Sequence, residues 1–344
     1  MTEFQLALLV IGALVVAGVF ATNWLQERGA RRAAERAFRS VAGDALLEAS
    51  GPRREPGMIP PATSRAAVPP QAALPDARID YVVELSFATP PAVGVLLEHW
   101  RPFEHRYAKR ARLAYTSDGT QWLRLAPGDS GSALALQAGL QLVTREGAVG
   151  EAELIEFRAA VESLAAATGA GVAAAEMRQA VDRARELDRF CADTDLQVVF
   201  HVMPQPGALF AGTTVRHAAE ADGLKLAEDG RFALQDDAGR VLFSLGARDG
   251  AGFTAGAIDS AAPAGLSITL DVPRAPGARR TFQAMADFAR QLAAELEGSL
   301  VDDNDHGLEE RSLAAIDAQL GAVHAAFAAR GIEPGSDVAL RLFS

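Results

Sequence analysis

The residues whose types could support catalysis or metal binding lie in two short polar stretches. "GDSGS" (128–132) imitates the nucleophile motif of trypsin-like proteases around Ser130. That mechanism needs a histidine base held by a carboxylate, and none of the 6 histidines lies in a matching context. "DDNDHG" (302–307) gathers acidic residues but lacks the register and the distal bidentate glutamate of a calcium-binding loop. We interpret both stretches as surface loops, and a hydrolase using Ser130 is the weakest of three functional hypotheses.

Other signatures of chemistry are missing from the sequence. It contains no Walker A motif, no dinucleotide fingerprint and no paired cysteine ligands. The single cysteine, Cys191, cannot form a disulfide within the chain, fits a reducing compartment and is interpreted as a packing residue. A net charge of −11 argues against a general nucleic-acid binder. The sequence therefore predicts a non-enzymatic protein with no catalytic residues, metal, cofactor, nucleic-acid partner or small-molecule substrate.

The N-terminus has the features of a membrane anchor. Residues 4–26 carry no charge and include the apolar run "LALLVIGALVVAGVFA" (6–21), about as long as a spanning helix requires. A signal peptide has basic residues before its apolar run, whereas Glu3 stands there; five arginines follow between positions 28 and 39. Basic residues stay on the cytoplasmic side, which predicts one transmembrane helix with its N-terminus outside. A cleaved signal peptide and a buried core helix are the alternatives.

The rest of the chain divides by composition and periodicity. Residues 51–77 include seven prolines and few large apolar residues, which is typical of a linker. We predict an anchor at 1–26, a basic juxtamembrane segment and Pro-rich linker at 27–77, a first α+β unit at 78–176, a connecting helix at 177–194, a second α+β unit at 195–330 and a tail at 331–344.

The two units share one order of elements: strand, helix, hairpin, strand, helix. The clearest strand is "GLSITLDVPR" (265–274), in which apolar and polar residues alternate, so that one face is buried and the other wet. A helix with an apolar stripe follows that strand in the second unit, and a stripe of identical spacing occurs in the first: Phe282, Met285, Ala289 and Leu292, against Leu154, Phe157, Val161 and Leu164. The match suggests duplication, although any two α+β domains look alike at this coarseness.

The second unit carries motifs that point to a family. "VLFSLGA", "GLSITLDVPR", a helix opening with Phe282, and "GSLVDDN" together resemble the C-terminal FtsZ-binding domain family of ZipA cell division proteins, over about residues 195–328. The layout of an anchor, a basic segment and a Pro-rich linker is also similar, and "LDRFCAD" and "LQLVTREG" resemble segments of long betaproteobacterial members. The resemblance implies an antiparallel sheet with helices packed on one face, an inner-membrane location, and a groove for the C-terminal tail of FtsZ.

The resemblance also implies where a peptide would bind. The expected site residues are Gln197, Val199, His201, Phe232, Phe243, Arg248, Ser267, Thr269 and Asp271. Thr269 and Arg248 stand where the family groove has large apolar residues, and Asp305 stands where it has a basic one, so we expect a more polar groove. Either binding is weak or the apolar anchors lie elsewhere, with Phe232 and Phe243 as candidates. The leading hypothesis is an inner-membrane division protein that binds FtsZ. The alternative is a membrane-anchored scaffold of the same fold that binds another division or envelope protein.

Overall fold

The computed structural model describes residues 74–344 except 108–109. The described residues all belong to one compact body. They form two α+β units, the helix that connects them and a C-terminal segment. The predicted anchor at 1–26 and nearly all of the predicted juxtamembrane segment and linker lie outside the described residues.

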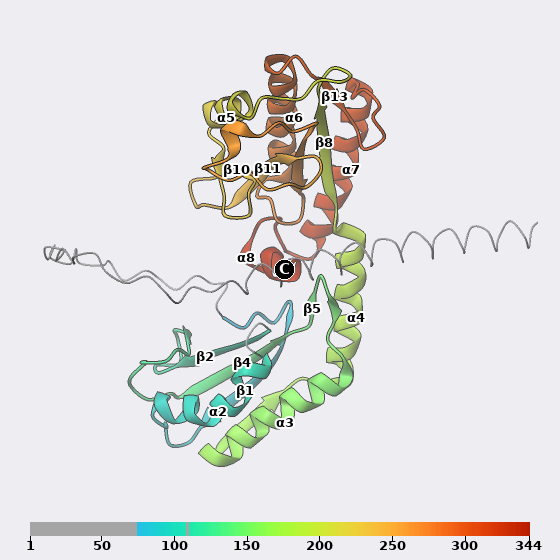
Figure 1. The fold of residues 1–344 in the computed structure, drawn as a ribbon. Coiled ribbons are helices and arrows are strands. Elements are labelled where there is room, and N and C mark those ends of the chain that lie inside the picture. The colour runs from blue at the N-terminus through green and yellow to red at the C-terminus, as the bar shows by residue number, and fades with distance from the viewer. Residues whose placement is uncertain (1–73, 108–109) are drawn as a thin grey trace, which may run out of the picture. The chain divides into compact units, whose positions relative to one another are not determined.

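The first unit is built around a five-stranded antiparallel sheet, shown with its helices in Figure 1. The strand order is β3-β2-β4-β1-β7. Its elements, in chain order, are β1 (Asp80–Phe87), α2 (Val93–Tyr107), β2 (Ala111–Thr116), β3 (Leu123–Arg124), β4 (Ala135–Gln141), the small hairpin β5 (Val143–Thr144) and β6 (Gly147–Ala148), α3 (Glu151–Thr168) and β7 (Ala170–Ala174).

Alternation along β1 gives the first sheet a helix-covered face and an open face. Tyr81, Val83 and Leu85 are almost completely buried, whereas Glu84 and Ser86 between and beyond them are exposed. The aromatic ring of Tyr81 meets that of Phe157 on α3 at 6.5 Å between centroids. The predicted stripe on α3 lies in this core, since Leu154, Phe157, Val161 and Leu164 are all buried.

The second unit is built around a six-stranded antiparallel sheet. The strand order is β13-β8-β12-β11-β10-β9. Its elements are β8 (Gln197–Met203), α5 (Gly212–Ala221), β9 (Lys225–Leu226), β10 (Phe232–Gln235), β11 (Val241–Ala247), a 3-10 turn (Ile258–Ser260), β12 (Leu266–Asp271), α6 (Ala278–Glu295), β13 (Ser299–Val301) and α7 (Glu310–Ala329).

The strand β12 alternates as its sequence predicts. Leu266, Ile268 and Leu270 are fully buried, and Ser267, Thr269 and Asp271 are half-buried. The helix α6 packs across β8, β11 and β12, and its stripe of Phe282, Met285, Ala289 and Leu292 is buried. The chain is therefore α+β, with antiparallel sheets and packed helices, as predicted.

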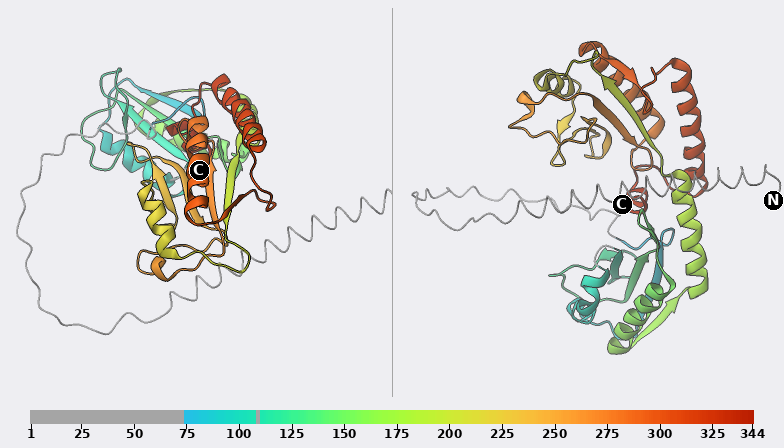
Figure 2. Two further views of the ribbon diagram at one scale, coloured as in Figure 1. Left: turned by 90° about the horizontal axis from the view of Figure 1, so that it is seen from above. Right: turned by 45° about the vertical axis from the view of Figure 1, so that its right-hand side comes forward.

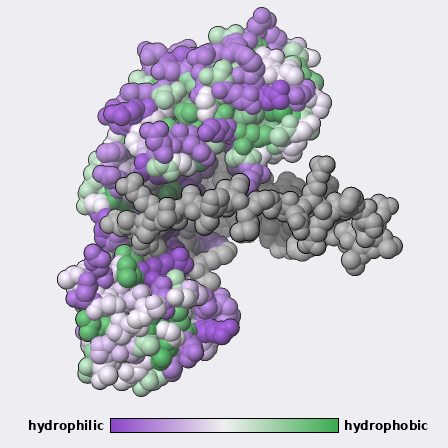
Figure 3. Space-filling view, turned by 90° about the vertical axis from the view of Figure 1, so that its left-hand side faces the viewer, coloured by the Kyte–Doolittle hydropathy of each residue, from purple (hydrophilic) through white to green (hydrophobic). Residues whose placement is uncertain are grey.

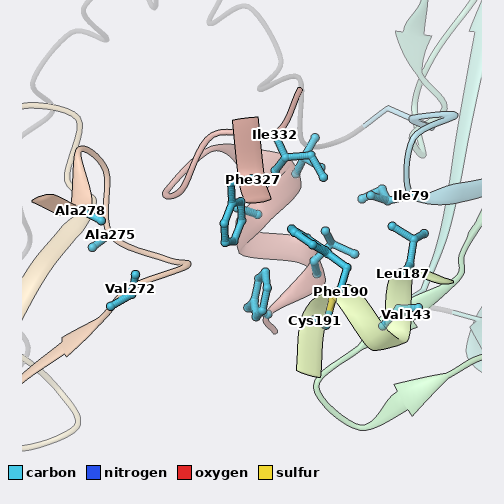
Figure 4. Close-up of a cluster of buried hydrophobic side chains, with 14 of the residues drawn as sticks. Ile79, Val143, Leu187, Phe190, Cys191, Val272, Ala275, Ala278, Phe327 and Ile332 are labelled. Atoms are coloured by element: carbon cyan, nitrogen blue, oxygen red, sulfur yellow. The ribbon is translucent and has the colours of Figure 1, made fainter. Parts of the chain in front are cut away.

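A connecting helix and a shared apolar cluster join the two units. The C-terminal end of the helix α4 (Met177–Thr194) meets that of α7, with the rings of Phe190 and Phe327 at 5.0 Å between centroids (Figures 1 and 2). Figure 4 shows this cluster, to which both units, α4 and the C-terminal part of the chain contribute. Its labelled members are Ile79, Val143, Leu187, Phe190, Cys191, Val272, Ala275, Ala278, Phe327 and Ile332.

Two parts of the chain differ from the prediction. The segment predicted as a tail contains the helix α8 (Asp337–Leu342), and Leu342 and Phe343 are fully buried. The short strand β7 was not predicted, because its sequence of alanine, glycine and valine has no polar–apolar alternation. Among the described residues, only α7 is long and apolar enough to cross a membrane by length and composition. Its Leu313, Leu320, Val323 and Phe327 are buried in the protein.

Candidate functional site

The register of three strands defines an open face on the second sheet. Ser267 pairs with His201 of β8 and with Gly246 of β11, and Thr269 pairs with Val199 and Ser244. Directly paired residues point to the same side of a sheet. We define the open face as Gln197, Val199, His201 and Met203 of β8, Ser244 and Gly246 of β11, and Ser267, Thr269 and Asp271 of β12.

A chain of hydrogen bonds crosses this face. His201 Nδ1 lies 2.9 Å from Ser267 Oγ, and His201 Nε2 lies 2.8 Å from Asp303 Oδ1. The three residue types match a hydrolase triad, but a nucleophilic serine needs oxyanion-hole donors beside it. Ser267 sits inside a strand flanked by β8 and β11, so its backbone N–H belongs to the sheet. The arrangement therefore fixes the imidazole and satisfies its nitrogens, and it does not assemble a hydrolase site.

Two arginines lie across the same face. Arg231 Nη2 donates to Thr269 Oγ1 at 2.9 Å. The Arg231 side chain lies over Gly246, where a Cβ would come 3.4 Å from Nε, and that Nε is buried without a hydrogen-bond partner. Arg248 Nη1 donates to Asp305 Oδ1 at 2.7 Å and lies 3.0 Å from the Met203 sulfur. The open face is therefore polar and covered by guanidinium groups.

One end of the open face adjoins the first unit. Asp271 pairs with Gln197 across the strands and accepts a hydrogen bond of 2.8 Å from Arg145, which lies between β5 and β6. Arg145 also donates to Asp195 at 2.7 Å. The hydrogen bond with Asp271 raises the pKa of the Arg145 guanidinium above its ordinary value. The carboxylate of Asp271 is thus already paired with an arginine of the same chain.

A cavity of about 490 Å³ opens at this end of the face. Its polar lining consists of arginines, aspartates and smaller polar groups, and its apolar lining comes from β11 and α8. The lining residues are Gln197, Asp229, Arg231, Gly239, Arg240, Val241, Leu242, Phe243, Ser244, Thr269, Asp271, Arg274 and Leu340. On the side of the molecule in Figure 3, hydrophilic and hydrophobic residues are interspersed over the second unit. The cavity therefore offers a limited apolar contact within a polar surround.

The two aromatic candidates point to the helix-covered side of the second sheet. Phe243 has the same parity in β11 as Leu245, which pairs with the buried Ile268. Its ring accordingly meets that of Phe288 on α6 at 5.5 Å between centroids. Phe232 pairs with Leu245 and is fully buried. Both rings therefore pack in the helix-covered core and not on the open face, and Phe243 also lines the cavity.

The remaining candidates share one side of the second sheet. Gln197, Val199, His201, Ser267, Thr269 and Asp271 are on the open face, and Arg248 follows β11 at its margin. Sequence reasoning missed Arg231, Asp303 and Leu340. Arg231 reaches the face by lying over Gly246, and Leu340 reaches it from α8. Such contacts join residues that are distant along the chain, so no local sequence pattern predicts them.

The two polar stretches around Ser130 and Asp302 form local turns. Asp129 Oδ2 accepts from the Ala126 backbone N–H at 2.8 Å, and Ser130 is exposed. Asp302 Oδ1 accepts from the backbone N–H groups of Asn304 and His306, and the bond from His306 lowers the pKa of the Asp302 carboxyl. Within the described part of the chain, no group of three or more histidine, cysteine or acidic residues is arranged to hold a metal ion.

Most of the second unit matches a known family. Residues 197–319 match the family described as "ZipA, C-terminal FtsZ-binding domain". This range contains every residue of the open face, whereas the first unit and the C-terminal segment lie outside it. No curated protein matches the chain.

Proposed function

We propose that the chain, whose residues 197–319 match the ZipA C-terminal FtsZ-binding domain family, binds the C-terminal tail of FtsZ on its open face and tethers the division ring to the bacterial inner membrane. The family is one of protein-binding domains that act in cell division. The face used and the peptide bound are inferred from the geometry of the second sheet, and the membrane anchor is inferred from the N-terminal sequence.

The observation that carries the proposal is the open face itself. Its strands β8, β11 and β12 present side chains that α6 does not cover, because α6 packs on the opposite side. Val199 supplies an apolar contact in the middle of the face, and Val241 and Leu242 supply more at the cavity. Peptide recognition takes most of its free energy from a few desolvated apolar anchors. We therefore expect an apolar peptide side chain to enter the cavity.

The guanidinium groups on this face set a limit on affinity. Arg231 occupies space over Gly246 and satisfies Thr269. A peptide crossing the centre of the face must either pack on this guanidinium or displace it. Each polar group left without a partner on binding costs about 1–3 kcal/mol. We therefore expect weaker binding than an apolar groove of equal area would give.

The membrane part of the proposal rests on the sequence. The uncharged stretch at 4–26 is long enough to span a bilayer, and the arginines that follow favour a cytoplasmic location for the rest of the chain. This topology puts the N-terminus in the periplasm and the open face within reach of a cytoplasmic polymer. A reporter joined after Ser344 through a flexible linker should be active only in cytoplasmic assays. Periplasmic activity would overturn the anchoring proposal.

The peptide site is tested by titrating a labelled FtsZ C-terminal peptide against the full chain. Thr269→Lys should weaken binding because it brings bulk and a charge next to Arg231. Loss of the bond from Arg231 should cost stability by about 1 kcal/mol, so the domain stays folded. Thr269→Phe should strengthen binding by adding an apolar anchor. Thr213→Lys is the matched control, since Thr213 is exposed on α5, and circular dichroism checks folding.

Two outcomes would count against the proposal. If both Thr269 variants bind like the parent, the peptide does not use this face. If the folded parent does not bind the peptide, FtsZ is not the partner, and a scaffold that binds another division or envelope protein becomes the better hypothesis.

A further inference from the structure

The C-terminal segment, residues 331–344, lies outside the family match yet is fastened to the second unit. The Gly335 backbone N–H donates to the Pro273 carbonyl at 2.9 Å, and Arg274 Nη1 donates to the Phe343 carbonyl at 2.8 Å. Gly335 has φ 74°. A Cβ at Gly335 would lie 2.3 Å from the Pro276 nitrogen. Only glycine allows this close approach, which holds the segment against the loop that follows β12.

The same segment is fastened to the first unit by a buried charge pair. Arg341 Nη2 lies 2.5 Å from Asp80 Oδ1, with side chains 7% and 0% exposed. Gln141 completes the site: its Nε2 donates to the Arg341 carbonyl at 2.7 Å, and its Oε1 accepts from Arg341 Nε at 3.3 Å. Breaking a buried pair from one side leaves an uncompensated charge and is strongly destabilising. The first unit therefore fixes the position of α8.

One apolar residue of α8 remains accessible for contacts at the peptide face. Ala339, Arg341, Leu342 and Phe343 are buried, whereas Leu340 between them is half-buried. Leu340 lines the cavity of about 490 Å³ together with Thr269 and Asp271 of the open face. It stands beside the β11 residues Val241 and Leu242, which supply other apolar lining. An apolar wall of this cavity thus comes from a helix that the family domain does not include.

We infer that Leu340 is a binding residue for an apolar side chain of the peptide, and that the first unit serves as the platform that positions it through Asp80, Gln141 and Arg341. The inference rests on the proposed function, because it assigns a wall to the same peptide site. It gives the first unit a role: it holds α8 at the edge of the open face. Arg341 acts through Leu340 and is a positioning residue.

The physical reason for such a platform is the short length of α8. Its six residues, Asp337–Leu342, are too few to form a stable helix in water by themselves. Leu340 on an unanchored helix would have to be ordered when the peptide binds, which costs affinity. The buried pair with Asp80 orders the helix in advance. The expected ligand is an extended peptide that presents one large apolar side chain to Val241, Leu242 and Leu340.

The test compares full-length variants in the same FtsZ-peptide titration. Leu340→Ser should weaken binding about tenfold, and Leu340→Met should restore most of it. Leu209→Ser is the control, because Leu209 is a leucine of the second unit that is 59% exposed and does not line the cavity. Unfolding curves establish that each variant is folded under the conditions of the titration.

The positioning role is tested by combining substitutions. Arg341→Lys should weaken binding in the parent but add little in the Leu340→Ser background, because its effect passes through Leu340. A role in stability alone predicts the same effect on binding in both backgrounds. Equal effects would overturn the positioning role. Parent-like binding by Leu340→Ser, with Thr269→Lys still impaired, would overturn the inference and leave the proposed function standing. If the folded parent binds no peptide, the proposed function fails and the inference fails with it.

Discussion

Each unit has a cross-strand pair of one aspartate and one glutamine at one end of its sheet, and the two pairs differ in their surroundings. In the first unit Asp80 pairs with Gln141, and in the second Gln197 pairs with Asp271. Each pair joins the start of the unit's first strand to the end of a long strand that pairs with it. Arg341 binds the first pair from the C-terminal segment, and Arg145 of the first unit binds Asp271. The first pair is buried and covered by the C-terminal segment, whereas the second pair borders an open cavity.

The difference extends over the open side of each sheet. In the first unit Pro75 lies on Gly139, where a Cβ would come 2.8 Å from the proline Cβ. Gly139 pairs with Val82, on the same side as Asp80 and Gln141. In the second unit the corresponding side carries half-buried polar residues and the cavity. One sheet face can thus serve as a docking surface within the chain while a related face stays available to a partner.

The two sheets share a core topology, so their faces can be compared position by position. Four strands of each sheet have the same order when they are numbered along their own unit: β2-β4-β1-β7 in the first and β11-β12-β8-β13 in the second. All neighbouring strands are antiparallel. This is the split βαβ arrangement of ferredoxin-like folds. The hairpins differ, since β3 follows the shared inner strand β2, whereas β10 precedes β11. We propose that the units arose by duplication, with the hairpin region changed in one of them.

The largest effect should come from a charge placed in either core. Ile268→Lys in the second unit and Val83→Lys in the first should each cost more than about 3 kcal/mol, because both residues are fully buried on the helix-covered side. Chemical unfolding followed by circular dichroism measures both. The shared topology predicts comparable losses. A folded, parent-like Ile268→Lys chain would contradict the assignment of β12 parity on which the open face depends.

The next effect separates the two arginines. Arg341→Ala should lower the free energy of unfolding by about 3–5 kcal/mol, because it leaves the carboxylate of Asp80 buried without its partner. Arg145→Ala should cost no more than about 1 kcal/mol, because Arg145 and Asp271 are 30% and 26% exposed and water can solvate the aspartate.

The control for Arg341→Ala is the double variant with Asp80→Asn. Removing the stranded charge should recover part of the loss. Equal losses for Arg341→Ala and Arg145→Ala would show that the two sheet ends do not differ in the way their burial indicates.

The sequence predicted those helices and strands whose buried face follows from the pattern of their own residues. The alternation of β12 and the stripes of α3 and α6 identify their buried faces, because burial follows the period of the element. The pattern fails for β7, whose small residues have no period, and for α8, which is short and gains its order from Arg341 and Asp80. These two elements depend on tertiary contacts that a local window does not contain.

The sequence could predict only those site residues whose orientation follows from the pattern of their own strand. Ser267 and Thr269 were assigned to the open face from the alternation of β12 alone. Phe232 and Phe243 were chosen for their residue type, whereas their orientation depends on how β10 and β11 pair with β12. Arg231 escaped notice for a similar reason, since its contact with Thr269 joins residues far apart in the sequence. Side-chain type suggests candidates, and strand pairing decides which of them share a face.

The smallest predicted effect is a pH dependence that belongs to the closed sheet end. Burial raises the pKa of the Asp80 carboxyl above 3.8, and Arg341 offsets this only in part. Between pH 3.8 and the raised folded value, the folded chain therefore holds a proton that the unfolded chain has already released, and above that range the carboxylate is ionised and paired with Arg341. The resulting stabilisation is present below pH 3.8 and lost as pH rises through the folded value. Asp80→Asn removes this titration. The free energy of unfolding of the parent minus that of Asp80→Asn should therefore fall from about pH 4 toward neutrality, as denaturant titrations at several pH values would show. A difference that rises with pH would mean that pairing with Arg341 lowers the pKa of the Asp80 carboxyl in the folded chain, so that charge pairing outweighs burial at this sheet end.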